Sequence, residues 1–278
     1  MRHENPSDEG QWNLRSQILV IITISIALLT IMVTGGFFID LEKLNVNLNN
    51  RNSSPSLAAL FGTDWLGRDM FSRTLKGLTL SFGVGILAAF SSTVISLLLS
   101  FLSSLNRTLD VIVTWLIDLF LSLPHIVTLL LISFAFGGGF KAVVIGLALT
   151  HWPSLTRLLR AELLQIKDTQ FVSVSRSLGR SNRWILYHHY LPLLAPQLLV
   201  GFILLFPHAI LHEATITFLG FGLSPEEPAI GIILSESMRY LSTGMWWLAV
   251  FPGLSLLLLV GIFDLLGQSV RKLIAPSR

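Results

Sequence analysis

The sequence lacks cysteine altogether, and charged residues make up only 13% of its 278 positions. Without cysteine the chain has no disulfides and no thiolate metal sites. A soluble domain usually has roughly 25% charged residues, whereas here hydrophobic residues reach 52%. The net charge of +3 is small and comes from residues between the apolar runs, so nucleic acid is not an expected partner. This composition predicts a membrane protein.

The sequence also lacks the short motifs that accompany catalysis. It has no G-x4-G-K-[ST] loop, so it cannot cradle the phosphates of ATP by itself. Its one run of glycines, 137–139, lies at the end of an apolar segment and predicts a tight turn. A G-x-S-x-G elbow, an H-E-x-x-H pair and a convergent carboxylate pair are absent as well. We therefore predict that the chain is not an enzyme and uses no cofactor.

Apolar runs recur along the chain, and about 20 helical residues are enough to cross roughly 30 Å of hydrocarbon. Backbone amides find no water there, so helices are the expected structure. No small-residue cleavage site follows the first run, which we interpret as a retained anchor rather than a signal peptide. The predicted fold class is all-α, a polytopic membrane protein with six transmembrane helices within residues 18–39, 78–105, 115–140, 142–156, 193–219 and 240–263.

Six spans place both termini on the same side of the membrane. That side has 12 lysines and arginines against 7 on the other, and cytosolic loops carry such an excess. Both termini are therefore predicted to be cytosolic. The expected organisation is a cytosolic N-terminal segment 1–17, a first transmembrane helix 18–39, an external loop 40–77, a core of five transmembrane helices 78–270 that includes a cytosolic loop 157–192, and a cytosolic tail 271–278.

The cytosolic stretch 171–192 is too polar to span and is long enough to form a docking surface. Phe171, Val174 and Leu178 recur at helical spacing and predict a short helix with an apolar stripe. Gly179 then permits a sharp turn, and Leu191-Pro192 returns the chain to the membrane. A groove on a partner protein could grip such a helix. An amphipathic helix lying on anionic lipid headgroups is the alternative interpretation.

Three stretches of this sequence resemble a known family. In 173–192, Gly179 and Leu191-Pro192 match the loop motif E-A-A-x3-G-x9-I-x-L-P of ABC-importer permeases, whereas the Glu, both Ala and the Ile do not match. FGTDWLGRDMFSR (61–73) is similar to the G-T-D-x-x-G-R-D-x-x-S-R signature of C-type permeases in the dipeptide, oligopeptide and nickel branch. EATITFLGFGL (213–223) is similar to the stretch that follows the fifth span of these permeases.

The stretch 61–73 also has a purely structural interpretation. Thr63 and Asp64 would cap turns, and Gly67 would adopt a positive φ. Arg68 and Asp69 would form a local ion pair. We expect these structural roles to hold inside the family as well.

The resemblance implies a type I ABC-importer permease of the MetI-like fold in the cytoplasmic (inner) membrane. Such a permease forms a heterodimer with a homologous permease in membrane lipid, two ATP-binding-cassette ATPases bind it from the cytosol, and an extracytoplasmic solute-binding protein delivers substrate. ATP hydrolysis takes place on the ATPase subunits. The residues expected to couple this chain to them are Phe171, Val174, Ser175, Leu178, Gly179, Arg180, Arg183, Leu191 and Pro192.

Two histidines of the fifth span lie four residues apart and so share one helical face. His208 and His212 could bind a borderline metal ion transiently, and with Glu213 they are the residues expected in the substrate pathway. Similar histidine placements occur in nickel and metallophore permeases, whereas Glu213 is shared with peptide permeases. The alternative is that both histidines hydrogen-bond to neighbouring helices. His125 and His151 could line the pathway as well, but packed, hydrogen-bonded side chains are the preferred interpretation.

These observations lead to one main functional prediction and several alternatives. The main prediction is import of a transition metal, free or bound to a metallophore, with nickel or cobalt favoured. Import of di- or oligopeptides is the alternative within the same mechanism. A secondary transporter driven by ion coupling is an alternative of another class; inverted repeats or broken midplane helices would favour it, and the sequence makes neither evident. An intramembrane metalloenzyme would lack a third ligand and a general base.

Overall fold

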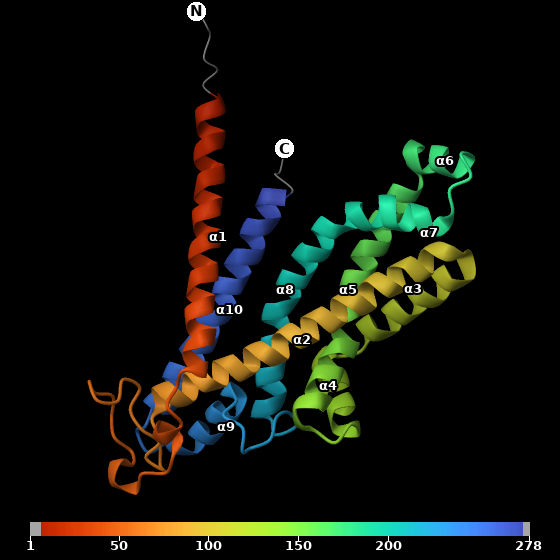
Figure 1. Ribbon diagram of the computed structural model, residues 1–278. Coiled ribbons are helices and arrows are strands. Elements are labelled where there is room, and N and C mark those ends of the chain that lie inside the picture. The colour runs from red at the N-terminus through yellow and green to blue at the C-terminus, as the bar shows by residue number, and fades with distance from the viewer. Residues whose placement is uncertain (1–6, 275–278) are drawn as a thin grey trace, which may run out of the picture. The chain divides into compact units, whose positions relative to one another are not determined.

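Figure 1 shows the computed structural model of the chain, which describes residues 7–274. Within this range the structure is helical apart from loops and one isolated bridge between Thr63 and Asp69. The long helices are α1 (Ser7–Phe37), α2 (Met70–Leu105), α3 (Arg107–Ser122), α4 (His125–Ala135), α5 (Gly139–Lys167), α8 (Leu191–Phe218) and α10 (Trp247–Ile274). The shorter elements are η1 (Leu41–Leu44), η2 (Leu48–Asn50), α6 (Gln170–Ser177), α7 (Asn182–Ile185), the π turn η3 (Leu186–Tyr190) and α9 (Ile230–Leu241). The prediction of an all-α fold is confirmed.

Five helices in the described range are long and apolar enough to cross a membrane, and α3 with α4 makes a sixth if the two count as one span. The chain bends by 99° between α3 and α4. The break falls at Leu123 and Pro124, because the residue before a proline is pushed toward extended backbone, and Leu123 has ψ 144°. The span predicted within 115–140 is therefore divided between two helices, α3 and α4. The apolar run continues through the break, so hydropathy does not reveal it.

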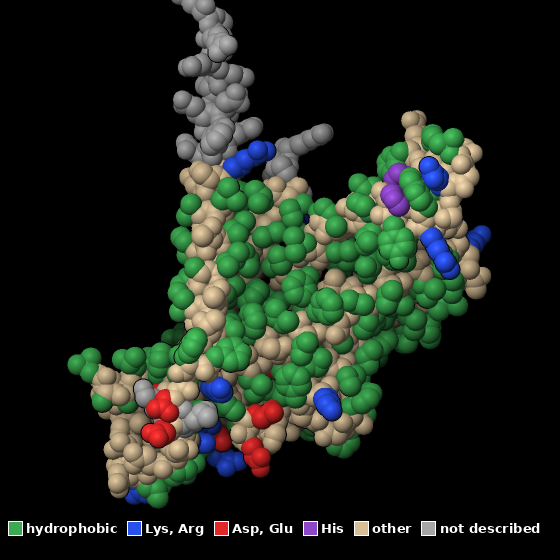
Figure 2. All heavy atoms as spheres, viewed as in Figure 1, with side chains coloured by type: hydrophobic (Ala, Val, Ile, Leu, Met, Phe, Trp, Pro, Cys, Tyr) green, Lys and Arg blue, Asp and Glu red, His purple; other side chains and the backbone are tan. Residues whose placement is uncertain are grey.

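Apolar side chains cover the visible flanks of the long helices, whereas charged side chains gather near helix ends and in loops (Figure 2). Many of the exposed side chains are large, such as Leu98 on α2, Leu131 on α4 and Leu257 on α10. In water such a surface would be unfavourable. In a bilayer it is the surface that hydrocarbon chains cover.

Contacts within the chain define two compact units, residues 1–82 with 226–278 and residues 83–225. In the first unit, α1 packs along α10, and α10 packs against α9. In the second unit, α5 is the central helix and contacts α3, α4 and α8. The second unit also contains the stretch 171–192 and the histidines at 125, 151, 208 and 212.

A ladder of serines fixes α5 against α2 within the second unit. The hydroxyl of Ser92 lies 3.3 Å from the carbonyl of Ala148, and the ladder continues with Ser96 to Trp152 at 3.0 Å and Ser100 to Thr156 at 3.4 Å. The serines lie one turn apart, as do the carbonyls. Small side chains of this kind allow two helix backbones to approach closely in a membrane. The ladder therefore sets the depth and rotation of α5, which carries His151.

Candidate functional site

The stretch 171–192 contains the predicted short helix, α6, which is eight residues long. Its apolar stripe is exposed: Phe171 is 44% exposed, Val174 57% and Leu178 74%. Figure 1 shows α6 at one end of the second unit, with α4 toward the opposite end of α5. The predicted helix and its apolar stripe are thus present on the surface of the protein.

Buried contacts hold α6 in place from its other side. Val172 is fully buried and belongs to a cluster with Leu163 on α5, Ile185 on α7 and Leu194 on α8. This cluster joins α6 to the two long helices α5 and α8. A force applied to the exposed stripe would therefore be transmitted to both of these helices.

Polar contacts tie the same short helix to the following segment. Ser175 Oγ lies 2.8 Å from His189 Nε2, and Arg176 Nη2 donates to the Tyr190 hydroxyl at 3.2 Å. After the helix, Gly179 adopts φ +75°, which L side chains rarely tolerate. The Arg180 guanidinium then covers the Trp184 ring at 4.8 Å, and Arg183 is exposed on α7. These contacts make the segment a defined surface rather than a loose loop.

The apolar helix α8 begins at Leu191, and Pro192 lies in its first turn. Together with α7 and η3 it forms one continuous helix from Asn182 to Phe218. The π turn η3 immediately precedes Leu191, and the Leu191 N–H donates to the Leu186 carbonyl. Proline has no N–H of its own to close an α-helical hydrogen bond. The wider turn ahead of Pro192 allows the helix to continue through it.

The structure brings His212 together with His125 and His151 rather than with His208. The ligand nitrogens of these three residues, which we call the histidine group, all lie within 4.8 Å of one another. His151 is buried, His125 and His212 are half-buried, and His208 is exposed and outside the group. Sequence reasoning treated His125 and His151 as packed side chains and missed the group. The one available signal was Pro124, whose helix break places His125 at the start of α4.

Glu213, the other residue expected in the substrate pathway, is fully buried next to His212 on α8. Its Oε1 accepts a hydrogen bond from the Thr217 hydroxyl at 2.9 Å, and the Thr217 oxygen accepts one from the Leu223 N–H at 3.2 Å. The backbone carbonyl of Phe221 in the same loop accepts a hydrogen bond from the Ser133 hydroxyl on α4 at 2.8 Å. The stretch 213–223 therefore joins the end of α8 to its loop and to α4.

In the first unit, Asp64 is the centre of the stretch 61–73. Its fully buried carboxylate accepts four hydrogen bonds: from the backbone N–H groups of Leu66 and Arg68, from Arg68 Nε at 2.7 Å, and from Arg73 Nη1 at 2.8 Å. Arg73 also pairs with Glu236 on α9 at 2.9 Å. Gly67 has the predicted positive φ of +74°. We call Asp64, Arg68, Arg73 and Glu236 the charge network.

The predicted ion pair between Arg68 and Asp69 is wrong, because Arg68 pairs with Asp64 instead. The Asp69 carboxylate has a different role. Its Oδ2 accepts a hydrogen bond from the Ser72 N–H at 2.8 Å, which caps the first turn of α2. An aspartate at a helix start satisfies backbone donors that no helical carbonyl can reach.

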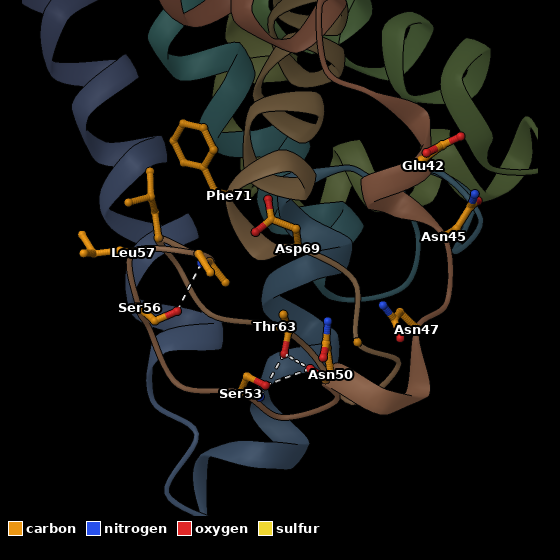
Figure 3. A pocket seen from close by; sticks show the side chains of 14 residues that line it. Glu42, Asn45, Asn47, Asn50, Ser53, Ser56, Leu57, Thr63, Asp69 and Phe71 are labelled. Atoms are coloured by element: carbon orange, nitrogen blue, oxygen red, sulfur yellow. Dashed lines mark hydrogen bonds between the residues drawn. The ribbon is translucent and has the colours of Figure 1, made fainter.

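A polar cavity of about 550 Å³ lies beside the charge network in the first unit (Figure 3). Ser53 and Thr63 line it and share the carbonyl of Asn50 as a hydrogen-bond acceptor. Asn45 and Asn47 line it as well and face it from the other side in Figure 3. This cavity therefore presents polar side chains to its interior.

Five long apolar helices in the described range and a short helix that carries an exposed apolar stripe are the features of a polytopic membrane protein. The chain belongs to the family of binding-protein-dependent transport system inner membrane components, whose model matches residues 83–276.

Similar proteins agree with this assignment. A putative peptide permease of Brucella suis biovar 1 is 34% identical over 93% of this chain and 85% of its own length. The dipeptide transport system permease DppC of Alkalihalophilus pseudofirmus is 30% identical over 93% of this chain and 84% of its own length. Among solved structures, the MetNI methionine ABC transporter has a chain that matches with a TM-score of 0.58 and 20% identity, covering 74% of this chain and 98% of that one. The fold is thus the MetI-like permease fold.

The protein is therefore a multi-pass inner-membrane subunit of an ABC importer. It is not an enzyme, and ATP hydrolysis takes place on separate subunits. Its partners are ATPase subunits and a solute-binding protein.

Proposed function

We propose that this permease imports small peptides or compounds built like them. The observation that carries this proposal is the 30–34% identity, over 93% of the chain, to proteins named as peptide and dipeptide permeases. These names favour the peptide alternative over free nickel or cobalt. We further infer that a homologous permease completes the pathway as a heterodimer, and that both termini face the cytosol, as the distribution of lysine and arginine indicates.

The exposed stripe of α6 is the surface on which the ATPase acts in this proposal. Phe171, Val174 and Leu178 would insert into a groove of that subunit. The buried cluster around Val172 supports this role, because it connects α6 to α5 and α8. Closure of the two ATPases would then move these helices and switch the pathway between its two openings.

The substrate is tested by transport into proteoliposomes that contain the complete importer with its binding protein. A radiolabelled dipeptide and a radiolabelled tetrapeptide are offered with ATP inside the lumen, and free Ni²⁺ is offered in a parallel experiment. We expect ATP-dependent uptake of at least one of the two peptides. Uptake of free Ni²⁺ without uptake of either peptide would contradict the proposal.

The coupling surface is tested in the same vesicles with Leu178→Asp. A charge on the most exposed residue of the stripe should abolish stimulation of ATP hydrolysis by the loaded binding protein. Ser173→Asp is the matched control, because Ser173 is exposed on the same helix but lies on a different face from the stripe. Equal loss of stimulation in both variants would remove the stripe from the coupling surface.

A further inference from the structure

Three helices of the second unit bring one histidine each to the same place. His125 is the first residue of α4 after the break at Pro124, His151 lies in the middle of α5, and His212 lies on α8. The ring centroids are 4.6 Å apart for His125 and His151, 4.4 Å for His125 and His212, and 5.3 Å for His151 and His212. Each of the three rings therefore contacts the other two.

The hydrogen bonds of His151 determine which of its nitrogens is available. Its Nδ1 lies 2.9 Å from the carbonyl of Leu147, and a carbonyl can only accept, so Nδ1 carries the proton. Nε2 of the neutral ring then has a free lone pair. This atom is buried and has no hydrogen-bond partner in the described structure. A backbone carbonyl that orients a histidine through its other nitrogen is the usual arrangement at metal-ligating histidines.

His125 has a second nitrogen of the same kind. Its Nδ1 is also buried and also lacks a hydrogen-bond partner among the described residues. Packed histidines normally satisfy their buried polar atoms, so two such atoms in one cluster are unusual. A ligand that accepts lone pairs from both atoms would account for them.

The donor set indicates which kind of ligand this is. Three imidazoles suit nickel, cobalt, copper(II) and zinc, whereas calcium and magnesium prefer oxygen ligands. Two nitrogens that bind one ion at about 2.0–2.1 Å can lie at most about 4.2 Å apart. The three ligand atoms lie within 4.8 Å of one another, so small rotations of the rings would close the site.

We propose that His125, His151 and His212 together bind a divalent transition-metal ion carried by the substrate. This inference rests on the proposed function and refines it: the cargo is a peptide-like chelate that bears a metal. Three protein ligands leave a coordination position open, which the chelator can occupy. Three neutral ligands also leave the charge of the ion uncompensated, so the ion can be released again.

The experiment uses the full chain assembled with its partner subunits and purified through a tag without histidine. The probes are Co²⁺, whose visible absorption reports nitrogen coordination, and Ni²⁺ in equilibrium dialysis. We expect one equivalent of metal to bind. His151→Asn should weaken binding at least about tenfold. The asparagine side chain can still donate to Leu147 but cannot act as the second nitrogen ligand, so loss of binding separates the ligand role from folding.

His208→Asn is the matched control, because His208 lies one turn from His212 but outside the group. It should leave metal affinity unchanged within about twofold. His125→Asn should weaken binding as His151→Asn does. Binding that is unaffected by His151→Asn and His125→Asn, or that is lost in His208→Asn, would overturn the proposal.

Measuring transport in the same preparation separates the proposed metal site from the proposed peptide import. If peptides are taken up but the complex binds neither Co²⁺ nor Ni²⁺, the metal site fails and the peptide importer stands. If metal binds as expected but no peptide or peptide chelate is taken up, the site stands and the proposed substrate class fails. Both the metal site and the peptide importer are supported if His151→Asn lowers uptake of a nickel–peptide chelate at least about tenfold but retains uptake of the metal-free peptide.

Discussion

The charge network and the histidine group are both clusters of polar side chains in a protein made mostly of apolar residues, but they differ in how completely they are paired. The Asp64 carboxylate accepts four hydrogen bonds, and Arg73 bridges it to Glu236. In the histidine group, by contrast, Nε2 of His151 and Nδ1 of His125 are buried without a hydrogen-bond partner in the described structure. Each charge of the network has a counter-charge, although Arg68 Nη2 makes no hydrogen bond within the described range and lies 3.8 Å from the Glu236 carboxylate. Opposite charges of this kind hold the fold together, whereas the unpaired imidazole nitrogens have no counterpart among the described residues and are left for a ligand.

The largest effect is expected from breaking the charge network with Asp64→Asn. The substitution leaves the buried guanidinium of Arg73 without its full counter-charge and removes one of the ion pairs of Arg68. Removing one partner of a buried ion pair costs about 3–5 kcal/mol. Thermal unfolding of the purified full chain should report a loss of this size.

Glu42→Gln is the control for this experiment, because Glu42 is an exposed carboxylate in the same segment between α1 and α2. It should change the unfolding free energy by less than about 0.5 kcal/mol. Equal stability of Asp64→Asn and Glu42→Gln would mean that the charge network does not support the fold, and the contrast with the histidine group would disappear.

A smaller effect is expected from Gly67→Ala, which tests the turn that shapes the charge network. Gly67 has φ +74°, and an added Cβ would lie 1.8 Å from the carbonyl oxygen of Asn47. The strained backbone and the displaced neighbour together should cost about 2–3 kcal/mol. Gly244→Ala isolates the backbone contribution, because Gly244 has φ +87° with nothing within 4 Å of an added Cβ.

For Gly244→Ala we expect a loss of only about 1 kcal/mol in the same unfolding measurement. A loss in Gly67→Ala no larger than this would show that Asn47 can move aside freely. The turn at Gly67 would then not be fixed by its contact with Asn47.

Much of the fold follows from the sequence, because backbone N–H and C=O groups inside a bilayer must pair with each other and long apolar runs therefore form helices. Each predicted span overlaps a helix, and the spacing of Phe171, Val174 and Leu178 predicts α6 and its exposed stripe. The break before α4 was missed, because Pro124 interrupts the backbone without interrupting the apolar run. The ion-pair partner of Arg68 could not be predicted either, because Asp69 is adjacent to it and Asp64 lies four residues before it.

The histidine group could not be predicted by the same reasoning. Helical spacing relates only residues within one helix, such as His208 and His212, which are four residues apart. Which helices meet, and at what depth, depends on contacts such as the serine ladder between α2 and α5 and on the break that turns α4. These are tertiary features, so His125 and His151 join His212 only in the folded protein.

A smaller change in stability than those of Asp64→Asn and Gly67→Ala is expected from His125→Leu, although this substitution alters the histidine group directly. Leucine has a similar volume and removes a buried nitrogen that has no hydrogen-bond partner among the described residues. The substitution removes the unpaired Nδ1 but also the hydrogen bond between the His125 ring and the Thr150 backbone. These two effects oppose each other, so the unfolding free energy should stay within about 1 kcal/mol of the wild type while metal binding is lost. A destabilisation as large as that of Asp64→Asn would instead mean that His125 serves the fold, and that both clusters are structural.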